Sequence, residues 1–250
     1  MVIKVTSIGY KSLALKILLV IISILYISFL YIDFFNVRTF ISSDVIKFIA
    51  IILCFFITLL TGEDSLNPRD LFLLKAGFFI TILADLCLII IDDFILGVSL
   101  FCMVQIFYSI RYKVDEFHPI LVRFMIVFLV VMVIYLIVNF FVIKIDVLFA
   151  VALFYSICLI DSVVRGIKAC KNNLYPYPNK YMIAYGMILF LLCDINVGLF
   201  NINRFINVSG DFGKLLHNTS FLLIWIFYIP SQVLLSLSGY DFNKKRNLKI

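Results

Sequence analysis

The chain has 250 residues, of which 64% are hydrophobic and only 14% charged, and its formal net charge is +6 at pH 7. A soluble domain carries about 25% charged residues, so this composition excludes a soluble globular protein. The apolar residues form long runs without a two-residue alternation, which excludes a transmembrane β-barrel. The positive charge is explained by contact with anionic lipid and requires no nucleic-acid partner.

Apolar runs of about 17 to 21 residues follow one another along the whole chain, and runs of this length predict transmembrane helices. The sequence therefore predicts an all-α, polytopic membrane protein with eight transmembrane helices in one bundle. Connections are short, so we expect one transmembrane domain over residues 1–250. The expected spans, in chain order, are 13–32, 45–61, 71–91, 94–110, 120–138, 147–164, 181–201 and 219–238.

Lys and Arg residues are distributed unevenly between the two sides of an eight-span protein. Sixteen of them fall on the side that holds both termini, and five (Arg38, Lys47, Lys144, Arg204 and Lys214) fall on the other side. Cytosolic loops carry the excess of Lys and Arg in membrane proteins. We therefore expect an integral protein of the cell membrane with both termini in the cytosol.

The third span carries a carboxyl group inside an apolar run. Thr81, Asp85 and Asp92 lie at positions i, i+4 and i+11, near one face of a regular helix. At a rise of 1.5 Å per residue, Asp85 lies roughly 21 Å above Leu71, within the hydrocarbon core. A carboxylate there costs several kcal/mol unless it is paired, hydrated or protonated, so Asp85 is a candidate functional residue.

The seventh span carries a second carboxyl group at a similar depth. Gly186, Phe190, Asp194 and Gly198 follow one another at four-residue steps, and Asp194 lies roughly 20 Å above Tyr181. Two carboxyls at one level indicate a single site, and we expect the third, fourth, seventh and eighth helices to line it. The alternative is that each Asp only joins helices through hydrogen bonds.

The fourth and eighth spans each place an amide and a phenol on one helix face. Gln105 and Tyr108 are three residues apart, and Tyr228 and Gln232 are four apart. We expect these four side chains to face the polar interior and to bind substrate, although either pair alone also suits an interhelical hydrogen bond.

Two other acidic patterns have ordinary explanations. Asp161 and Arg165 are four apart near the end of the sixth span and predict an ion pair at the interface. Asp92 and Asp93 predict a solvated turn between the third and fourth spans. The six cysteines form no CxxC motif and the chain has no HExxH motif, so we expect neither a metal site nor a cofactor.

Three stretches of the chain resemble the YhhN family, whose characterised members are lysoplasmalogenases. They are ADLCLIIIDDFILGVSLFCMVQIFY from Ala84 to Tyr108, GMILFLLCDINVGLFNINRF from Gly186 to Phe205, and YIPSQVLL from Tyr228 to Leu235. The resemblance spans most of the chain and includes the count of eight helices. It implicates a set of residues carried over by position: Asp85, Gly97, Tyr108, Asp194, Tyr228 and Gln232.

The chain departs from the family pattern at three places. Ala84 stands where the family usually has Gly, and Cys193 where it has Ser. The usual Ala-His pair of the fourth helix is Val104-Gln105 here. If that histidine moves protons in the family's reaction, Gln105 does not replace it.

The resemblance implies hydrolysis of the vinyl ether of a lysoplasmenyl phospholipid, or of a related ether lipid, to a fatty aldehyde and a glycerophospho-alcohol. Asp85 and Asp194 are then the catalytic acid and base, in a division of labour like that of glycosidases. Two other functions stay open. The chain is a transporter-like protein that binds a lipid or an ion, or it is a family member without catalytic activity.

Overall fold

A computed structural model of the protein describes residues 2–62, 65–112, 117–202 and 210–242. Within these ranges the chain forms helices α1 (Val2–Phe35), α2 (Ser43–Thr61), α3 (Pro68–Asp85), α4 (Phe94–Arg111), α5 (Phe117–Phe141), α6 (Val147–Lys171), α7 (Asn179–Phe200) and α8 (Asp211–Leu237). Eight helices in the described part are long and apolar enough to cross a membrane. The predicted fold class and span count are confirmed, and α1 and α8 extend beyond the predicted spans.

Several helices begin at a polar side chain that caps their free N–H groups. The Asn67 amide oxygen accepts a 2.9 Å bond from the N–H of Arg69, and Pro68 follows as the first residue of α3. Asp93 caps α4 through the N–H of Leu96 at 3.0 Å. These caps fix where the chain enters the bundle after each short connection.

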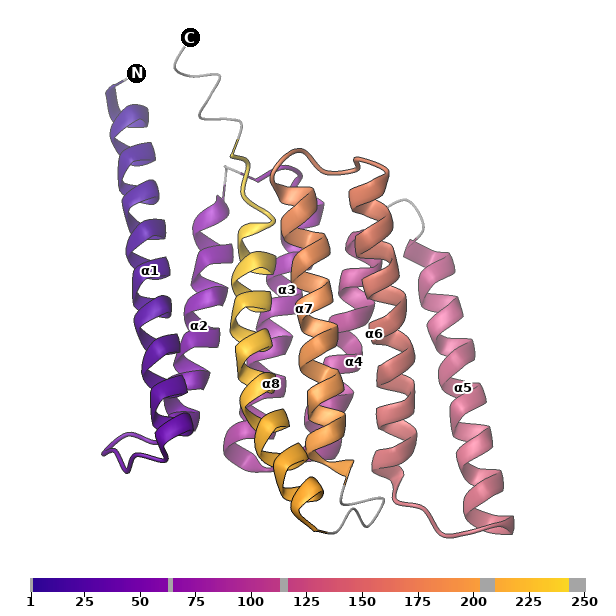
Figure 1. Ribbon diagram of the computed structural model, residues 1–250. Helices are drawn as coiled ribbons and strands as arrows, with labels where there is room; N and C mark the ends of the chain where they lie inside the picture. The colour runs from indigo at the N-terminus through magenta and orange to yellow at the C-terminus, as the bar shows by residue number, and fades with distance from the viewer. Residues whose placement is uncertain (1, 63–64, 113–116, 203–209, 243–250) are drawn as a thin grey trace.

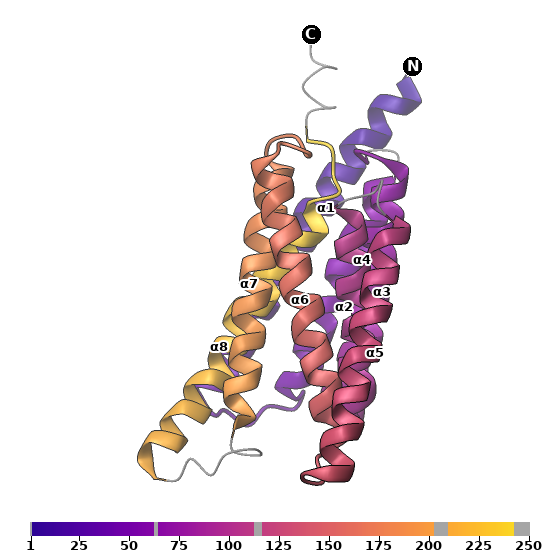
Figure 2. The same ribbon diagram turned by 90° about the vertical axis from the view of Figure 1, so that its right-hand side faces the viewer.

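Six helices form a closed ring in which each packs against its two neighbours, in the order α2, α3, α4, α6, α7 and α8, with α8 returning to α2. Helix α1 lies outside this ring against α2 and α8, and α5 lies outside it against α6 and α4. Figure 1 shows α1 and α5 at the two edges of the bundle, and Figure 2 shows α6, α7 and α8 on one side of it.

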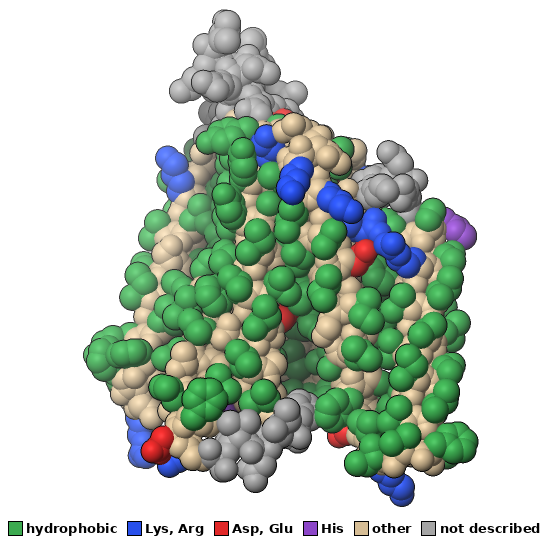
Figure 3. All heavy atoms as spheres, turned by 45° about the vertical axis from the view of Figure 1, so that its right-hand side comes forward, with side chains coloured by type: hydrophobic (Ala, Val, Ile, Leu, Met, Phe, Trp, Pro, Cys, Tyr) green, Lys and Arg blue, Asp and Glu red, His purple; other side chains and the backbone are tan. Residues whose placement is uncertain are grey.

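The first turn of α1 and the last turn of α8 lie at the same end of the bundle, which we call the terminal end (Figure 1). An even number of spans requires this arrangement. On the face that Figure 3 shows, hydrophobic side chains cover the surface between the two ends, while Lys and Arg side chains gather at the ends. This distribution matches a helical bundle surrounded by lipid.

The third span differs from the regular helix that the sequence predicts. Helix α3 ends at Asp85 and continues as a π-helical segment, η2 (Leu86–Ile91). Asp92, the residue after this segment, has the left-handed conformation (φ 61°). A π turn holds more residues than an α turn and changes the face on which later residues lie. Thr81 and Asp85 are therefore buried while Asp92 is exposed, so the expectation that all three share one face is wrong.

Candidate functional site

Asp85 lies at the junction between α3 and η2, with only 3% of its surface exposed. Its Oδ2 accepts a hydrogen bond of 2.7 Å from the hydroxyl of Tyr228 on α8. This contact joins two spans that lie far apart in the sequence, and it satisfies a polar group that is costly to bury alone. Residues next to π turns are frequent components of functional sites.

Asp194 lies on α7 and is half-buried. Its Oδ2 accepts a hydrogen bond of 2.5 Å from the hydroxyl of Tyr155 on α6. Sequence reasoning did not identify Tyr155. The available signal was a single phenol in the otherwise apolar first half of the sixth span. Helix α6 therefore also lines the polar interior, which we expected only the third, fourth, seventh and eighth helices to do.

The two carboxyl groups lie in one region of the ring interior, because packed aromatic rings connect their tyrosine partners: Tyr155 contacts Phe101, Phe101 contacts Phe190, and Phe190 contacts Tyr228. Each has its own tyrosine partner, Tyr228 for Asp85 and Tyr155 for Asp194. The Cys193 side chain lies within electrostatic reach of both carboxyls. The pair thus belongs to one region of the ring interior, and its action on one substrate stays a prediction.

The other residues assigned to substrate binding are all buried inside the ring: Gln105, Tyr108, Tyr228 and Gln232. The Oε1 of Gln105 accepts a hydrogen bond of 2.6 Å from Ser162 on α6. Among the described residues, Nε2 of Gln105 and both amide atoms of Gln232 lack a hydrogen-bond partner. Buried amide atoms of this kind usually bind ordered water or a polar ligand.

Gly97 on α4 permits a close approach between α4 and the segment that follows Asp85. A Cβ atom at this position would lie 2.5 Å from Cδ2 of Leu88 and 3.3 Å from the carbonyl oxygen of Ala84. A side chain here would push η2 away from α4. Gly97 therefore helps to position Asp85 through packing, without a contact of its own to the carboxyl group.

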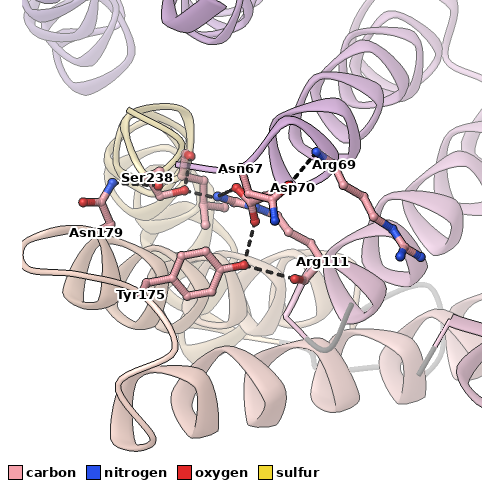
Figure 4. A network of polar contacts seen from close by, with 8 residues as sticks. Asn67, Arg69, Asp70, Arg111, Tyr175, Asn179 and Ser238 are labelled. Carbon is pink, nitrogen blue, oxygen red and sulfur yellow. Dashed lines mark hydrogen bonds and ion pairs between the residues drawn. The ribbon is translucent and has the colours of Figure 1, made fainter. Parts of the chain in front are cut away.

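A second buried polar network lies at the terminal end and was not predicted from the sequence (Figure 4). The Arg111 guanidinium, at the end of α4, binds both carboxylate oxygens of Asp70 on α3, with Nε–Oδ1 at 2.8 Å and Nη2–Oδ2 at 3.0 Å. Its Nη1 also donates to the Ser238 hydroxyl at 2.9 Å. Asn179 donates through Nδ2 to the carbonyl oxygens of Ser238 and Tyr240, at 2.9 and 2.7 Å.

Tyr175, in the connection between α6 and α7, completes this network. Its hydroxyl lies 2.6 Å from Oδ1 of Asp70 and 3.0 Å from the carbonyl oxygen of Arg111, and its single hydrogen serves one of them at a time. Burial raises the pKa of the Tyr175 hydroxyl, so it stays a donor. The network ties α3, α4, α7 and α8 together at one end of the ring.

Two cations that the Lys and Arg count placed on opposite sides of the membrane are buried inside the bundle. Arg111 belongs to the network above, and Lys47 on α2 pairs with Asp33 on α1 at 2.9 Å. The Lys47 ammonium also lies 4.5 Å from the centre of the Trp225 ring. Asp33 and Trp225 lie on other helices, so spacing within α2 did not reveal them, whereas Asp44, three residues before Lys47 and 3.2 Å from its ammonium, is a partner on the same helix.

The predicted ion pair on α6 is confirmed, with Nε of Arg165 at 2.5 Å from Oδ2 of Asp161. Arg123 on α5 joins it, because its Nη1 lies 3.1 Å from Oδ1 of the same carboxylate. Among the described residues, no three His, Cys, Asp or Glu side chains converge as metal ligands would. The described residues bring carboxyl groups, phenols, amides and the buried thiol of Cys193 to the candidate site.

No match was found among curated proteins or among solved structures. The family model described as the YhhN family matches residues 42–239, from just before α2 to just beyond the end of α8. The matched range contains Asp85, Asp194 and both of their tyrosine partners. Because the match covers most of the chain, the resemblance inferred from the sequence is confirmed and this protein belongs to the YhhN family.

Proposed function

We propose that this protein is a lysoplasmalogenase-type hydrolase that cleaves the vinyl ether bond of lysoplasmenyl phospholipids or a related ether lipid. The observation that carries the proposal is the pair of intramembrane carboxyls, Asp85 and Asp194. Each accepts a hydrogen bond from a tyrosine hydroxyl, and contacts between aromatic rings connect the two tyrosines. A buried acid and base suit a reaction that needs one proton donor and one oriented water molecule.

The proposed reaction adds water across the vinyl ether. A carboxylic acid donates a proton to the alkenyl carbon remote from the ether oxygen, which leaves an oxocarbenium ion. Water attacks this cation and loses a proton to the second carboxylate, giving a hemiacetal. In the last step the bond between the hemiacetal carbon and the glycerol oxygen breaks. The second carboxyl, now protonated, gives its proton to the glycerol oxygen, and the first, now ionised, takes the proton of the hemiacetal hydroxyl. A fatty aldehyde and a glycerophospho-alcohol leave, and both carboxyls return to their starting states.

The residues of the ring interior supply these roles without a cofactor in the scheme. Asp85 and Asp194 provide the acid and the base, and the negative charge of the ionised partner stabilises the oxocarbenium ion. Tyr228 and Tyr155 orient the two carboxyls. Gln105, Tyr108 and Gln232 present polar groups that can bind the glycerol or head-group oxygens of the substrate.

One observation favours a second candidate, a family member that binds lipid or an ion and has no catalytic activity. The position where the family usually has histidine holds Gln105, whose Oε1 already accepts from Ser162. An amide at this position does not exchange protons near neutral pH as an imidazole does. The two candidates predict opposite results in one assay.

The test is incubation of the purified full-length protein, in detergent, with a lysoplasmenyl phospholipid, followed by measurement of free fatty aldehyde. Aldehyde release that depends on Asp85 and Asp194 supports the hydrolase. Binding of the intact lipid without aldehyde release supports the second candidate. We also propose that the protein resides in the cell membrane with both termini in the cytosol, since the Lys and Arg excess lies on that side.

A further inference from the structure

A groove runs along the outside of the ring between α5 and α6, near the terminal end of the bundle. It encloses a volume of about 900 Å³. Its walls are apolar and are formed mainly by Ile120, Phe124, Val127, Ile157, Ile160 and Val164. Helix α5 contributes no residue to the candidate site around Asp85 and Asp194, so this groove is a separate feature of the molecule.

Positive charge is concentrated where the groove meets the terminal end. Arg123 on α5 and Arg165 and Lys168 on α6 line it, together with the carboxylate of Asp161. Three cations against one carboxylate leave a net charge of +2 at this site. Figure 3 shows Lys and Arg side chains gathered on this face above the hydrophobic belt.

The cations are arranged so that part of their charge is available to a ligand. Asp161 holds Arg165 and Arg123 in place, at 2.5 and 3.1 Å, yet the Arg123 side chain is 59% exposed. Lys168 is exposed and makes no ion pair or hydrogen bond with another described residue. An exposed guanidinium and an exposed ammonium thus face the same hollow.

The depth of these groups matches a phospholipid in one leaflet. Lys168 lies three residues before the end of α6 and Arg123 six residues after the start of α5, which places them about 5 and 9 Å inside the helix ends. Ile157 lies about 21 Å inside the end of α6 by the same rise. A phosphate at the level of the cations would therefore have an acyl chain beside the apolar walls.

We propose that this groove binds a phospholipid with net negative charge, with its phosphate between Arg123 and Lys168 and an acyl chain along the walls formed by α5 and α6. The positive-inside rule explains why cations lie near the helix ends at the terminal end. It does not explain why several of them line one groove. The proposal concerns a non-catalytic site and holds whether or not the protein is a hydrolase.

The experiment is a lipid titration of the purified full-length protein in detergent, followed by native mass spectrometry, with phosphatidylglycerol and phosphatidylcholine of the same acyl chains. The unsubstituted protein is expected to retain one phosphatidylglycerol in preference to phosphatidylcholine. In Arg123→Gln/Lys168→Gln the affinity for phosphatidylglycerol should fall about thirtyfold, the size expected for two membrane-surface cations. The control Lys16→Gln/Arg69→Gln removes two exposed cations that lie near the same end and outside the groove. It should change the affinity for phosphatidylglycerol less than twofold.

A second pair of variants distinguishes a lipid bound within the groove from a lipid attracted only by the positive charge of the protein. Ile160→Trp fills the groove and leaves every cation in place, so it should also weaken phosphatidylglycerol binding. Val122→Trp adds the same side chain at an exposed position of α5 that does not line the groove, and binding should be unchanged. The proposal would be overturned if the groove variants and their controls lost phosphatidylglycerol binding equally, or if the protein retained the two lipids equally. It would also be overturned if the groove variants abolished a protein dimer and left lipid binding unchanged.

Discussion

The hydroxyl of Tyr228 donates a hydrogen bond of 2.7 Å to Asp85, and so connects α8 to the point where α3 becomes π-helical. Tyr155 and Asp194 repeat this relationship between α6 and α7. A hydrogen bond from a phenol holds a carboxyl group in one orientation, which an acid or base in catalysis requires. The ring of six helices thus brings together two carboxyl–phenol pairs from four separate spans.

Asp85→Asn and Asp194→Asn should each lower turnover by at least about a hundredfold, the usual contribution of a catalytic acid or base. Asn keeps the shape of the side chain, but it supplies neither an acidic proton nor a negative charge. The measurement is the initial rate of aldehyde release from a lysoplasmenyl phospholipid. Asp92→Asn is the matched control, since it changes an exposed turn residue and should leave the rate unchanged. Undiminished activity in both site variants would end the two-carboxylate mechanism.

Tyr228→Phe and Tyr155→Phe should reduce turnover by smaller factors than the Asp variants, about ten- to a hundredfold, because each loses one hydrogen bond to a charged group and keeps the carboxyl. Tyr26→Phe also removes a hydroxyl that contacts α8, at 3.2 Å from the Ile226 carbonyl oxygen, but it lies on α1 outside the ring. Its turnover should match that of the unsubstituted protein. If the two site variants behave like Tyr26→Phe, the phenols have no role in orienting the carboxyls.

Gln105→His tests whether the missing histidine limits the reaction. An imidazole with a pKa of about 6.5 can relay protons near neutral pH, which an amide does not do. Aldehyde release should therefore rise, and the gain should vary with pH around that value. Gln105→Met preserves length without polarity and should not produce the gain. Equal rates in the His, Met and unsubstituted proteins would show that position 105 only packs against its neighbours.

The hydropathy of the chain was sufficient to predict the eight spans, because each apolar run must cross the membrane by itself. It did not predict the π turn after Asp85, where α4 and η2 approach each other closely at Gly97. Tyr155 and Ser162 were missed for a related reason. Their contacts with Asp194 and Gln105 form only when α6 enters the ring, and spacing within one helix carries no signal of a partner on another.

The charge count was similarly useful for topology and uninformative about individual residues. It placed Arg111 and Lys47 on opposite sides of the membrane, but it did not indicate that both are buried in ion pairs with Asp70 and Asp33. A single sequence does not show which distant carboxylate will meet a given cation. The terminal network and the Lys47 pair therefore emerge only from the packing of the helices.

The positive-inside expectation can be tested on two exposed connections at opposite ends of the bundle. In a Cys170→Ser background, Leu174→Cys places a thiol between α6 and α7, and Phe40→Cys places one between α1 and α2. An impermeant maleimide added to intact cells should label Phe40→Cys only, because the Lys and Arg excess predicts that the Leu174 side faces the cytosol. Labelling at Leu174→Cys in intact cells would reverse the orientation.

The Arg111–Asp70 pair should contribute to stability more than any exposed ion pair of this protein. Removing one partner of a buried pair leaves an uncompensated charge and costs about 3–5 kcal/mol. Arg111→Gln and Asp70→Asn should therefore lower the thermal unfolding midpoint strongly in detergent. Tyr175→Phe should lower it less, since it removes one hydroxyl and no charge. Arg69→Gln is the matched control, because this neighbouring arginine is exposed and its side chain points away from the network (Figure 4). A midpoint for Arg111→Gln equal to that of Arg69→Gln would show that the network does not stabilise the terminal end.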